Sequence, residues 1–415
     1  MLDRPHLRRG REPHQSPGWI CGAATLALLL IGCSDASSDS SPQTSSGPLY
    51  VTATRVFTGD DSSGYLTTFT SPEAGQHVDL SHAIEMNDAW VFGKADPYFY
   101  TATLFEPTIR RWELSANGEI VPGPTLSFAN QGVSGTYTAS STPIFSKTKS
   151  YFVDSASQQV VIWNPSDMSF VGTIALDVEP QSGFTPNFEI AVTAAKVFVT
   201  VFWGSQASGW SKFGSSTRII SIDPKSDRVI ASTDEPRCET LSPAGVTSDQ
   251  TAYFSPWDYH ALARSVFGDG FGARSCALRV VPPATSYDAG YDVDLSTLVG
   301  GRPAGSMIVT GNDQALIHVW HDDQAHATSA NWADDRFLPG YLWYRWQLGA
   351  AHAEPLPNQA PSSEGGTWIT LGDKTYTLSA NPEYSETTLA ELTPSGELVP
   401  GATIEGWTTN VIRVR

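Results

Sequence analysis

The sequence predicts an all-β protein, a single β-propeller of seven blades that is closed by its C-terminal strand in the N-terminal blade. Three observations predict this fold. The body of the chain consists of short strand-like runs bounded by Gly, Pro and Asp turns, related runs recur at spacings of about 46 to 63 residues, and a final strand has no partner of its own.

The strand signal comes from short runs in which β-branched or aromatic residues alternate with other residues. Residues 50–57 (YVTATRVF) and 196–202 (KVFVTVF) are clear examples, and each is followed by turn-forming residues. No long stretch has apolar residues at helical spacing. With only 16% charged residues and no charge-rich linker inside the body, one large closed domain is expected.

The repeat is clearest in residues 151–174, where three short strands are separated by two turns. Similar units with the same order of strands and turns recur along the body, and their size matches a four-stranded propeller blade. The seven units start near Tyr50, Tyr98, Tyr151, Val197, Tyr253, Leu316 and Tyr376.

The two ends of the body are expected to complete each other. Residues 410–415 (NVIRVR) form a strand without a partner, and the unit at Tyr50 lacks its innermost strand. Pairing these two segments would remove two open sheet edges. Six or eight blades would fit with other boundaries, and an irregular sandwich or a β-helix is the alternative architecture.

The first 32 residues have the composition of a signal peptide. Four arginines precede residues 19–32, which carry no charge and are too few to span about 30 Å of hydrocarbon. This segment ends in Leu30-Ile31-Gly32-Cys33, which resembles the lipobox of bacterial lipoproteins, in which the cysteine is lipidated. The alternative is an ordinary secretory signal with an incidental cysteine.

We therefore expect a signal peptide over residues 1–32, a lipidated Ser-rich tether over 33–48 and a propeller domain over 49–415. The tether has almost no apolar side chain to bury. The expected location is the bacterial cell envelope, at the outer membrane, with the lipid on Cys33 as the contact to the membrane.

The charge of the chain narrows its possible partners. There are 43 Asp and Glu against 25 Lys and Arg, which gives a formal net charge of -18. Such a surface repels phosphate backbones and anionic lipid headgroups, so nucleic-acid binding is excluded and no basic patch is expected to hold the membrane.

Two cysteines, Cys238 and Cys276, remain once the leader is removed and Cys33 is lipidated. In an oxidising compartment this pair is expected to form a disulfide. A metal pair or two free thiols are the alternatives, although no histidine or further cysteine lies at ligand spacing beside either residue.

Ligand-binding candidates lie where predicted strands of three successive units end, because propellers bind ligands at the mouth of the central channel. Their indole rings could stack on a planar ligand such as a catecholate. The candidates are Trp203, Trp257, Asp258, Tyr259, His260, Trp320, His321 and Asp322. The alternative is that the tryptophans fill wedge-shaped gaps between blades.

No catalytic residue, metal site or cofactor is predicted. His318, His321 and His326 are the only histidine cluster, but residues three apart on a strand point to opposite faces. Asp154, Asp258, Asp288 and Glu113 could take part in catalysis, yet nothing in the sequence pairs them.

A family resemblance is carried by residues 236–298. Arg237-Cys238, Thr251 to Ser255, Ser275 to Val280 and Tyr287 to Leu295 follow in an order similar to that of exported propeller lipoproteins of siderophore systems, the MxcI-like group and the related DUF4374 group. The unit at 151–174 resembles YVTN-type and quinoprotein-amine-dehydrogenase-like blades. The resemblance implies an envelope role in the uptake of iron chelates.

Two functions follow as expectations. The first is an envelope-anchored scaffold that binds a ligand or a protein, with a ferric siderophore or an envelope receptor as partner. The alternative is a propeller enzyme, either a hydrolase or lactonase or a quinone-type dehydrogenase. Carboxylates that converge at one end of the channel would favour the enzyme.

Overall fold

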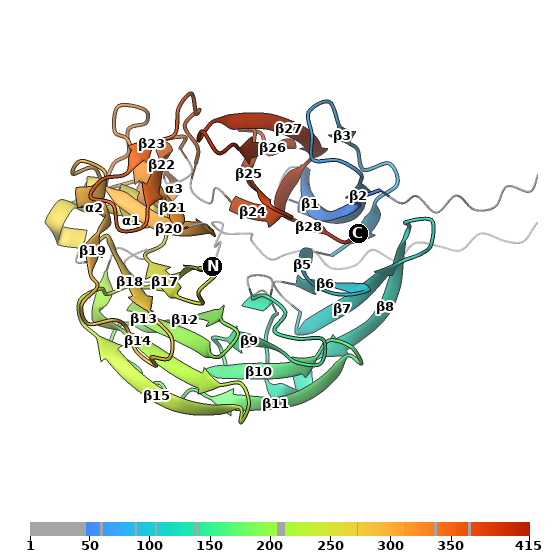
Figure 1. Cartoon of the computed structure of the whole chain (residues 1–415), viewed down its shortest axis with the longest axis horizontal. Coiled ribbons are helices and arrows are strands. Elements are labelled where there is room, and N and C mark those ends of the chain that lie inside the picture. The colour runs from blue at the N-terminus through green and yellow to red at the C-terminus, as the bar shows by residue number, and fades with distance from the viewer. Residues whose placement is uncertain are drawn as a thin grey trace, which may run out of the picture.

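Seven antiparallel sheets form a closed ring around a central axis in the computed structural model (Figure 1). The structure describes residues 47–415 apart from 59–60, 88, 104–105, 137, 140–141, 206–211, 272, 312, 336–337 and 364–366. The predicted seven-bladed all-β propeller is confirmed. The predicted leader, Cys33 and tether residues 34–46 lie outside the described residues.

Each sheet is one blade, and its strands are named from the centre of the ring outward. Blade 1 consists of β28 (Trp407–Arg413), β1 (Tyr50–Thr58), β2 (Asp61–Phe69) and β4 (Ile84–Met86). Blade 2 consists of β5 (Ala89–Ala95), β6 (Tyr98–Thr103), β7 (Thr108–Leu114) and β8 (Ile120–Ser127). Blade 3 consists of β9 (Ser150–Asp154), β10 (Gln159–Asn164) and β11 (Ser169–Ala175).

Blades 4 to 7 follow around the ring in chain order. Blade 4 consists of β12 (Thr185–Val192), β13 (Val197–Gly204), β14 (Phe213–Asp223) and β15 (Arg228–Glu235), and blade 5 of β16 (Ser242–Val246), β17 (Ala252–Ser255), β18 (Cys276–Val280) and β19 (Val293–Asp294). Blade 6 consists of β20 (Ala304–Gly311), β21 (Gln314–Trp320), β22 (Tyr341–Gln347) and β23 (Glu354–Pro355). Blade 7 consists of β24 (Thr367–Leu371), β25 (Lys374–Ala380), β26 (Glu386–Leu392) and β27 (Leu398–Glu405).

Short helices lie in the connections between strands. They are η1 (Ala129–Gln131), α1 (Tyr259–Phe267), η4 (Gly268–Phe271), α2 (Leu295–Leu298) and α3 (Trp332–Asp335). Within the described part of the chain, none of the helices has the length and apolar character that a membrane crossing needs.

The predicted repeat units coincide with the blades. Every predicted starting residue lies in one of the inner strands of a different blade, in β1, β6, β9, β13, β17, β21 and β25. The unit at 151–174 corresponds to β9, β10 and β11, the three strands of blade 3. The repeat was detectable because most neighbouring strands within a blade follow each other in the sequence and are joined through short turns.

The ring is closed by two segments from opposite ends of the described chain. β28 pairs antiparallel with β1, with Arg413 opposite Tyr50, so the C-terminal strand is the innermost strand of blade 1 as predicted. A second closure was not predicted. β3 (His77–Val78), which lies between β2 and β4 in the sequence, adds a parallel strand to the outer edge of blade 7, with His77 opposite Thr403.

Aromatic side chains fill the spaces between neighbouring blades. Tyr100 of blade 2 meets Trp163 of blade 3 edge to face, with ring centroids 5.2 Å apart. The geometry is the one that aromatic pairs prefer, and it buries both rings. Five tryptophans are less than 2% exposed: Trp112, Trp163, Trp203, Trp320 and Trp346.

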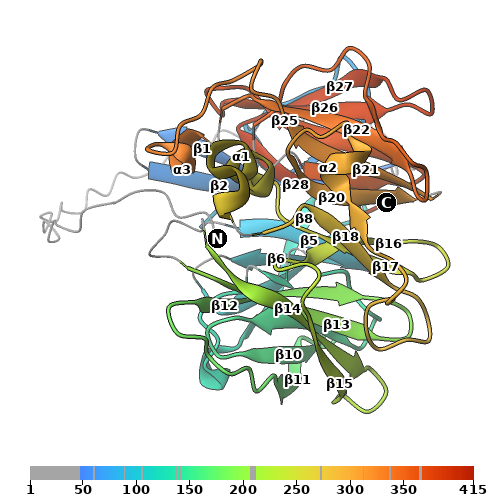
Figure 2. The same cartoon turned by 90° about the vertical axis from the view of Figure 1, so that its left-hand side faces the viewer.

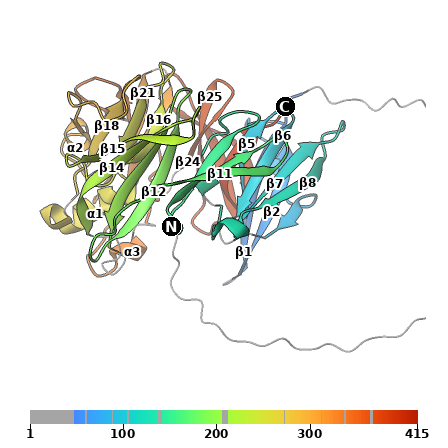
Figure 3. The same cartoon turned by 90° about the horizontal axis from the view of Figure 1, so that it is seen from below.

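One end of the ring carries extra structure. α1 and α3 lie at this end, and Arg415 lies at the opposite end, as the two side views agree (Figures 2 and 3). α1 and η4 lie in the connection from β17 to β18, and α3 lies in the connection from β21 to β22. We call α1, η4 and α3 the helical rim.

Candidate functional site

The helical rim is held together by a small aromatic core. The buried ring of Tyr259 in α1 lies 6.0 Å from the indole of Trp332 in α3, and Phe267 lies 5.7 Å from the same indole. We expected residues 257–260 in a loop after a strand, whereas Tyr259 and His260 begin a nine-residue helix. The sequence did not reveal the helix because its apolar stripe is short.

Asp258 immediately precedes α1 and faces blade 6. Its carboxylate accepts a hydrogen bond from the hydroxyl of Ser306 on β20. The backbone of Asp258 reaches β20 because residue 305 is glycine: a Cβ at Gly305 would lie 2.3 Å from the carbonyl oxygen of Asp258. The contact with β20 therefore fixes the carboxylate at the start of the helix.

His318 lies on β21 and is fully buried. Its imidazole is stacked between two rings of β22, with centroid distances of 4.4 Å to Tyr341 and 4.0 Å to Trp343. The register explains this stack, because His318 is the direct cross-strand partner of Trp343. The imidazole is thereby held in one plane.

The two ring nitrogens of His318 face two different polar groups. Nδ1 lies 3.2 Å from Oδ1 of Asp258, and Nε2 lies 3.0 Å from Oγ of Ser362. Nδ1 has no hydrogen-bond partner in the described part of the chain, so its contact with Asp258 is close but is not a hydrogen bond in this geometry. Catalytic hydrogen bonds are often longer or less aligned before a substrate binds.

Ser362 lies on the connection from β23 to β24 and is half-buried. Its backbone exchanges two hydrogen bonds with Tyr341, from Ser362 N to Tyr341 O at 2.8 Å and from Tyr341 N to Ser362 O at 3.0 Å. Gln359 ties the same connection to blade 6 by accepting from Trp343 N and donating to Trp343 O. The backbone of Ser362 is therefore fixed beside the imidazole.

Asp258, His318 and Ser362 form a linear arrangement from carboxylate to imidazole to hydroxyl, which we call the relay. The same order of groups activates the nucleophile of serine hydrolases on several unrelated folds, where it is recognised by geometry and not by sequence position. Of the three residues, Asp258 was predicted as a site residue, His318 was considered as a metal ligand, and Ser362 was not considered.

The similarity of this chain to known proteins lies in its fold. No protein-family model matches the chain, and no curated protein matches it either. Two solved structures resemble it: a putative 6-phosphogluconolactonase from Bacteroides fragilis (TM-score 0.55, 10% identity, 90% of this chain and 100% of that one) and the periplasmic gluconolactonase PpgL of Pseudomonas aeruginosa (0.54, 9%, 88% and 99%).

A third similar structure is a hypothetical selenium-binding protein from Sulfolobus tokodaii, with a TM-score of 0.51, 9% identity and coverage of 88% of this chain and 93% of that one. The shared feature is the propeller. At these identities the likeness shows the fold alone.

Two of the predicted ligand-binding tryptophans are not accessible to a ligand. Trp203 is 1% exposed within the core between blades 3 and 4, and Trp320 is fully buried against Tyr341. They lie inside β13 and at the last position of β21, not beyond the strands, so their indoles point into the packing between blades. The expected ring of three ligand-facing tryptophans is therefore wrong, and the wedge-filling alternative describes Trp203 and Trp320.

The other candidates in the helical rim differ in their surroundings. Trp257 is half-buried, and its ring contacts Phe202 edge to face at 4.9 Å. His260 is 1% exposed, Nδ1 lies 3.2 Å from Oγ1 of Thr240, and Nε2 has no hydrogen-bond partner among the described residues. Burial lowers the pKa of His260 to about 3, so its imidazole is neutral and structural.

The candidates of the β21–α3 connection fasten the helical rim to blade 6. Asp322 accepts hydrogen bonds from Ser265 of α1 at 2.6 Å and from Nε1 of Trp320 at 2.7 Å. His321 faces away from the relay, toward Tyr344, whose hydroxyl lies 3.2 Å from Nε2. Burial lowers the pKa of His321, and nearby Arg302 lowers it further.

The two predicted disulfide cysteines are bonded to each other in the structure. Both are fully buried. Cys238 precedes β16, and Cys276 begins β18, directly after the α1–η4 insertion. Because Thr240 contacts His260, the cross-link ties the segment that contacts the start of α1 to β18.

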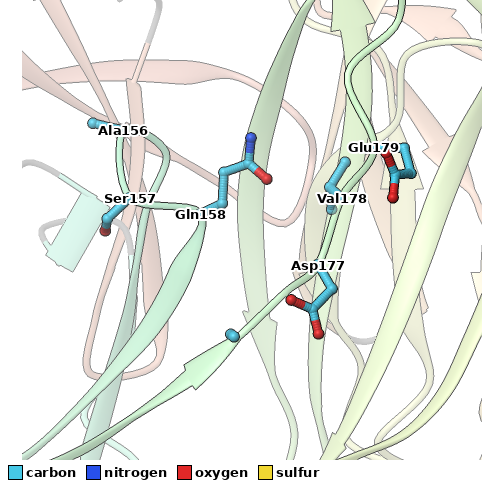
Figure 4. Close-up of a pocket in the computed structure, with 7 residues that line it drawn as sticks. Ala156, Ser157, Gln158, Asp177, Val178 and Glu179 are labelled. Carbon is cyan, nitrogen blue, oxygen red and sulfur yellow. The ribbon is translucent and has the colours of Figure 1, made fainter.

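Other features of the described residues do not form a site. No group of three His, Cys, Asp or Glu side chains in this part of the chain could hold a metal ion. A pocket lies between the β9–β10 turn and the segment that follows β11, and Figure 4 shows the side chains that line it. It contains the carboxylates of Asp177 and Glu179 but none of the predicted site residues.

Proposed function

We propose that this protein is a serine hydrolase that cleaves a carboxylic ester or a lactone at the end of the propeller that carries the helical rim. The observation that carries the proposal is the relay, in which Nε2 of His318 lies 3.0 Å from Oγ of Ser362 and Nδ1 lies 3.2 Å from Asp258. This corresponds to the hydrolase alternative that we weighed from the sequence.

In this mechanism Oγ of Ser362 attacks the carbonyl carbon of the substrate, and its proton passes to Nε2 of His318. Collapse of the tetrahedral intermediate breaks the bond to the leaving alkoxide oxygen, which takes the proton back from His318. A water molecule then hydrolyses the acyl-enzyme in the same way and regenerates the serine. Asp258 stabilises the imidazolium that forms in both steps.

The fold supports this chemistry. Two structures with the same architecture are named as lactonases, and the lactone bond is an internal ester. The relay is made of residues of this chain, so the proposal depends on its geometry and not on those names.

The test is covalent labelling and ester hydrolysis by the purified full chain. A fluorophosphonate probe should label Ser362, identified by mass spectrometry of the peptide, and hydrolysis of 4-nitrophenyl acetate should be lost in Ser362→Ala and His318→Ala. Ser363→Ala is the matched control, because it changes the adjacent hydroxyl and leaves the relay intact.

Circular dichroism of each variant shows whether the protein is still folded, so a loss of activity in a folded variant is due to the relay. If folded Ser362→Ala hydrolyses the ester as fast as the unchanged protein, or if the probe labels another serine, the proposal is wrong.

We further propose that the protein is exported and anchored through lipid on Cys33 at the outer membrane. The sequence of residues 1–33 supports this, as does the Cys238–Cys276 disulfide, because such bonds persist in oxidising compartments. Metabolic labelling with a fatty acid should mark the unchanged protein and not Cys33→Ser. Labelling of both would contradict the proposal.

A second candidate function is a scaffold that binds a ferric siderophore or an envelope receptor. It is favoured by the order of residues in 236–298 that resembles siderophore-associated lipoproteins and by the half-buried Trp257, which lies just before α1. Micromolar ferric catecholate should quench the tryptophan fluorescence, and less so in Trp257→Phe. Absence of quenching would remove this candidate.

A further inference from the structure

The surroundings of the relay narrow the substrate class of the proposed hydrolase. Resting on that proposed function, we infer that the site takes an uncharged ester or lactone with an aromatic group and rejects sugar lactones that carry a phosphate. Two independent properties of the described residues carry this inference, the sign of the charges and the chemistry of the rings beside Ser362.

Several carboxylates lie near the relay at this end of the ring. Asp258 belongs to the relay itself, and Asp322 accepts two hydrogen bonds, both from uncharged donors. Asp323 is exposed and lies 3.4 Å from the guanidinium of Arg302. These carboxylates would repel an anionic substrate. The net charge of -18 of the chain adds to this repulsion.

Two cations near the relay are engaged by other groups. Arg264 of α1 donates to the carbonyl of Ala273 at 2.7 Å, and Arg274 pairs with Asp292 at 3.1 Å. Neither His318 nor Ser362 has a lysine or arginine among its hydrogen-bond or ion-pair partners in the described chain. A phosphate group is bound in proteins by such cations and by backbone donors, and the described surroundings of the relay show no cation for it.

An aromatic ring lies partly exposed near the serine. Tyr341 and Trp343 enclose the imidazole and are 0% and 3% exposed, so they are not open to a substrate, but Trp343 in turn meets Trp368 edge to face at 5.4 Å. Trp368 is half-buried near the start of β24, six residues after Ser362, in the innermost strand of blade 7. Aromatic ring faces bind uncharged planar groups well, so they suit an aryl ester or an aryl lactone.

The experiment compares kcat/KM of the full chain for three substrates, namely dihydrocoumarin, glucono-δ-lactone and 6-phosphoglucono-δ-lactone. We expect dihydrocoumarin to exceed the phosphorylated lactone by at least about 100-fold, which corresponds to about 2.7 kcal/mol. Trp368→Ala should reduce the rate with dihydrocoumarin by about tenfold and leave glucono-δ-lactone within about twofold. Phe170→Ala, which removes an exposed aromatic ring on β11 of blade 3, is the control and should leave both rates unchanged.

The outcomes separate the two proposals. Equal or faster hydrolysis of the phosphorylated lactone, dependent on Ser362, would overturn the inference and leave the hydrolase intact. Equal loss with both uncharged lactones in folded Trp368→Ala would overturn the aromatic part of the inference. Absence of Ser362-dependent hydrolysis with all three substrates, together with absence of fluorophosphonate labelling, would overturn the proposed function itself.

Discussion

The imidazole of His318 lies nearly parallel to the indole of Trp343, with ring centroids 4.0 Å apart and an interplanar angle of 12°. A ring face carries negative charge density, so it stabilises a cation placed over it. In the proposed reaction that cation is the imidazolium that His318 becomes when it takes the proton of Ser362. In that reaction the stack would contribute to the rate as well as to the packing.

Replacement of Trp343 by leucine is expected to slow ester hydrolysis. Loss of a desolvated cation–π contact of about 1–2 kcal/mol corresponds to about 5- to 30-fold in kcat. Steady-state kinetics with 4-nitrophenyl acetate measure the effect, and Trp343→Phe should recover part of it. An unchanged kcat in a folded Trp343→Leu protein would contradict this role.

Asp258→Asn is expected to reduce kcat by about 10²- to 10⁴-fold, because an amide does not stabilise the imidazolium and can select the wrong tautomer. Asp322→Asn is the matched control, since Asp322 contacts Ser265 and Trp320 but not the relay. Single-turnover hydrolysis of 4-nitrophenyl acetate measures the rate of each variant. Equal rates in the two variants would show that Asp258 has no part in catalysis.

Removal of the disulfide is expected to lower stability without abolishing the fold. The bond closes a segment of 38 positions, which corresponds to about 3–4 kcal/mol in the chain-entropy model. Urea unfolding of Cys238→Ala/Cys276→Ala should show this loss, and reductant should destabilise the unchanged protein but not the variant. A reductant effect of equal size on both proteins would contradict the assignment.

The stability of the fold is expected to fall with acid through His260. Its pKa is about 3 in the folded protein, lowered by burial from an ordinary value of 6.5. The unfolded chain therefore binds one proton more than the folded chain between these values, and the free energy of unfolding decreases as the pH falls from about 6.5 to about 3.

Urea unfolding at several pH values measures this dependence. One proton changes the free energy of unfolding by at most about 1.4 kcal/mol per pH unit. His260→Leu should flatten the profile. A variant with the same slope as the unchanged protein would show that other groups cause the acid sensitivity.

A chain that ends at Gly406 is expected not to form a closed ring. It lacks β28, so β1 loses its inner partner and the buried side chain of Val411 is removed from the core shared with blade 7. Aggregation during size-exclusion chromatography would show the open edge. A chain shortened only by residues 414–415 keeps β28 and should elute as a monodisperse species, and equal behaviour of the two would contradict the role of β28.

The sequence was sufficient for the architecture because each blade is a local structure. The strands at 150–154 and 159–164 are joined by a short turn, and such alternation can be detected in a short window of sequence. Closure by β28 followed from unpaired strands at both ends. The parallel addition of β3 could not be predicted, since two residues, His77 and Val78, give no periodic signal.

The site was only partly predictable, because it depends on distances that the sequence does not contain. His318 and Ser362 are 44 positions apart, and Ser362 lies in a stretch of Pro and Ser that has the composition of an ordinary turn. Asp258 could be named, but its partners come from other connections. The accessibility of Trp203 and Trp320 was misjudged because a shift of one or two residues at a strand end moves a side chain from solvent into the core.

The pairing of β28 with β1 also decides when this protein can become a rigid body. β1 begins at Tyr50, and the strand that completes its blade ends at Arg413, so the first blade to leave the ribosome is the last to be finished. Until then every partial ring retains an exposed edge. The export that we propose would benefit from such a delay, because a chain that is still open can pass through a membrane channel, whereas a closed ring cannot.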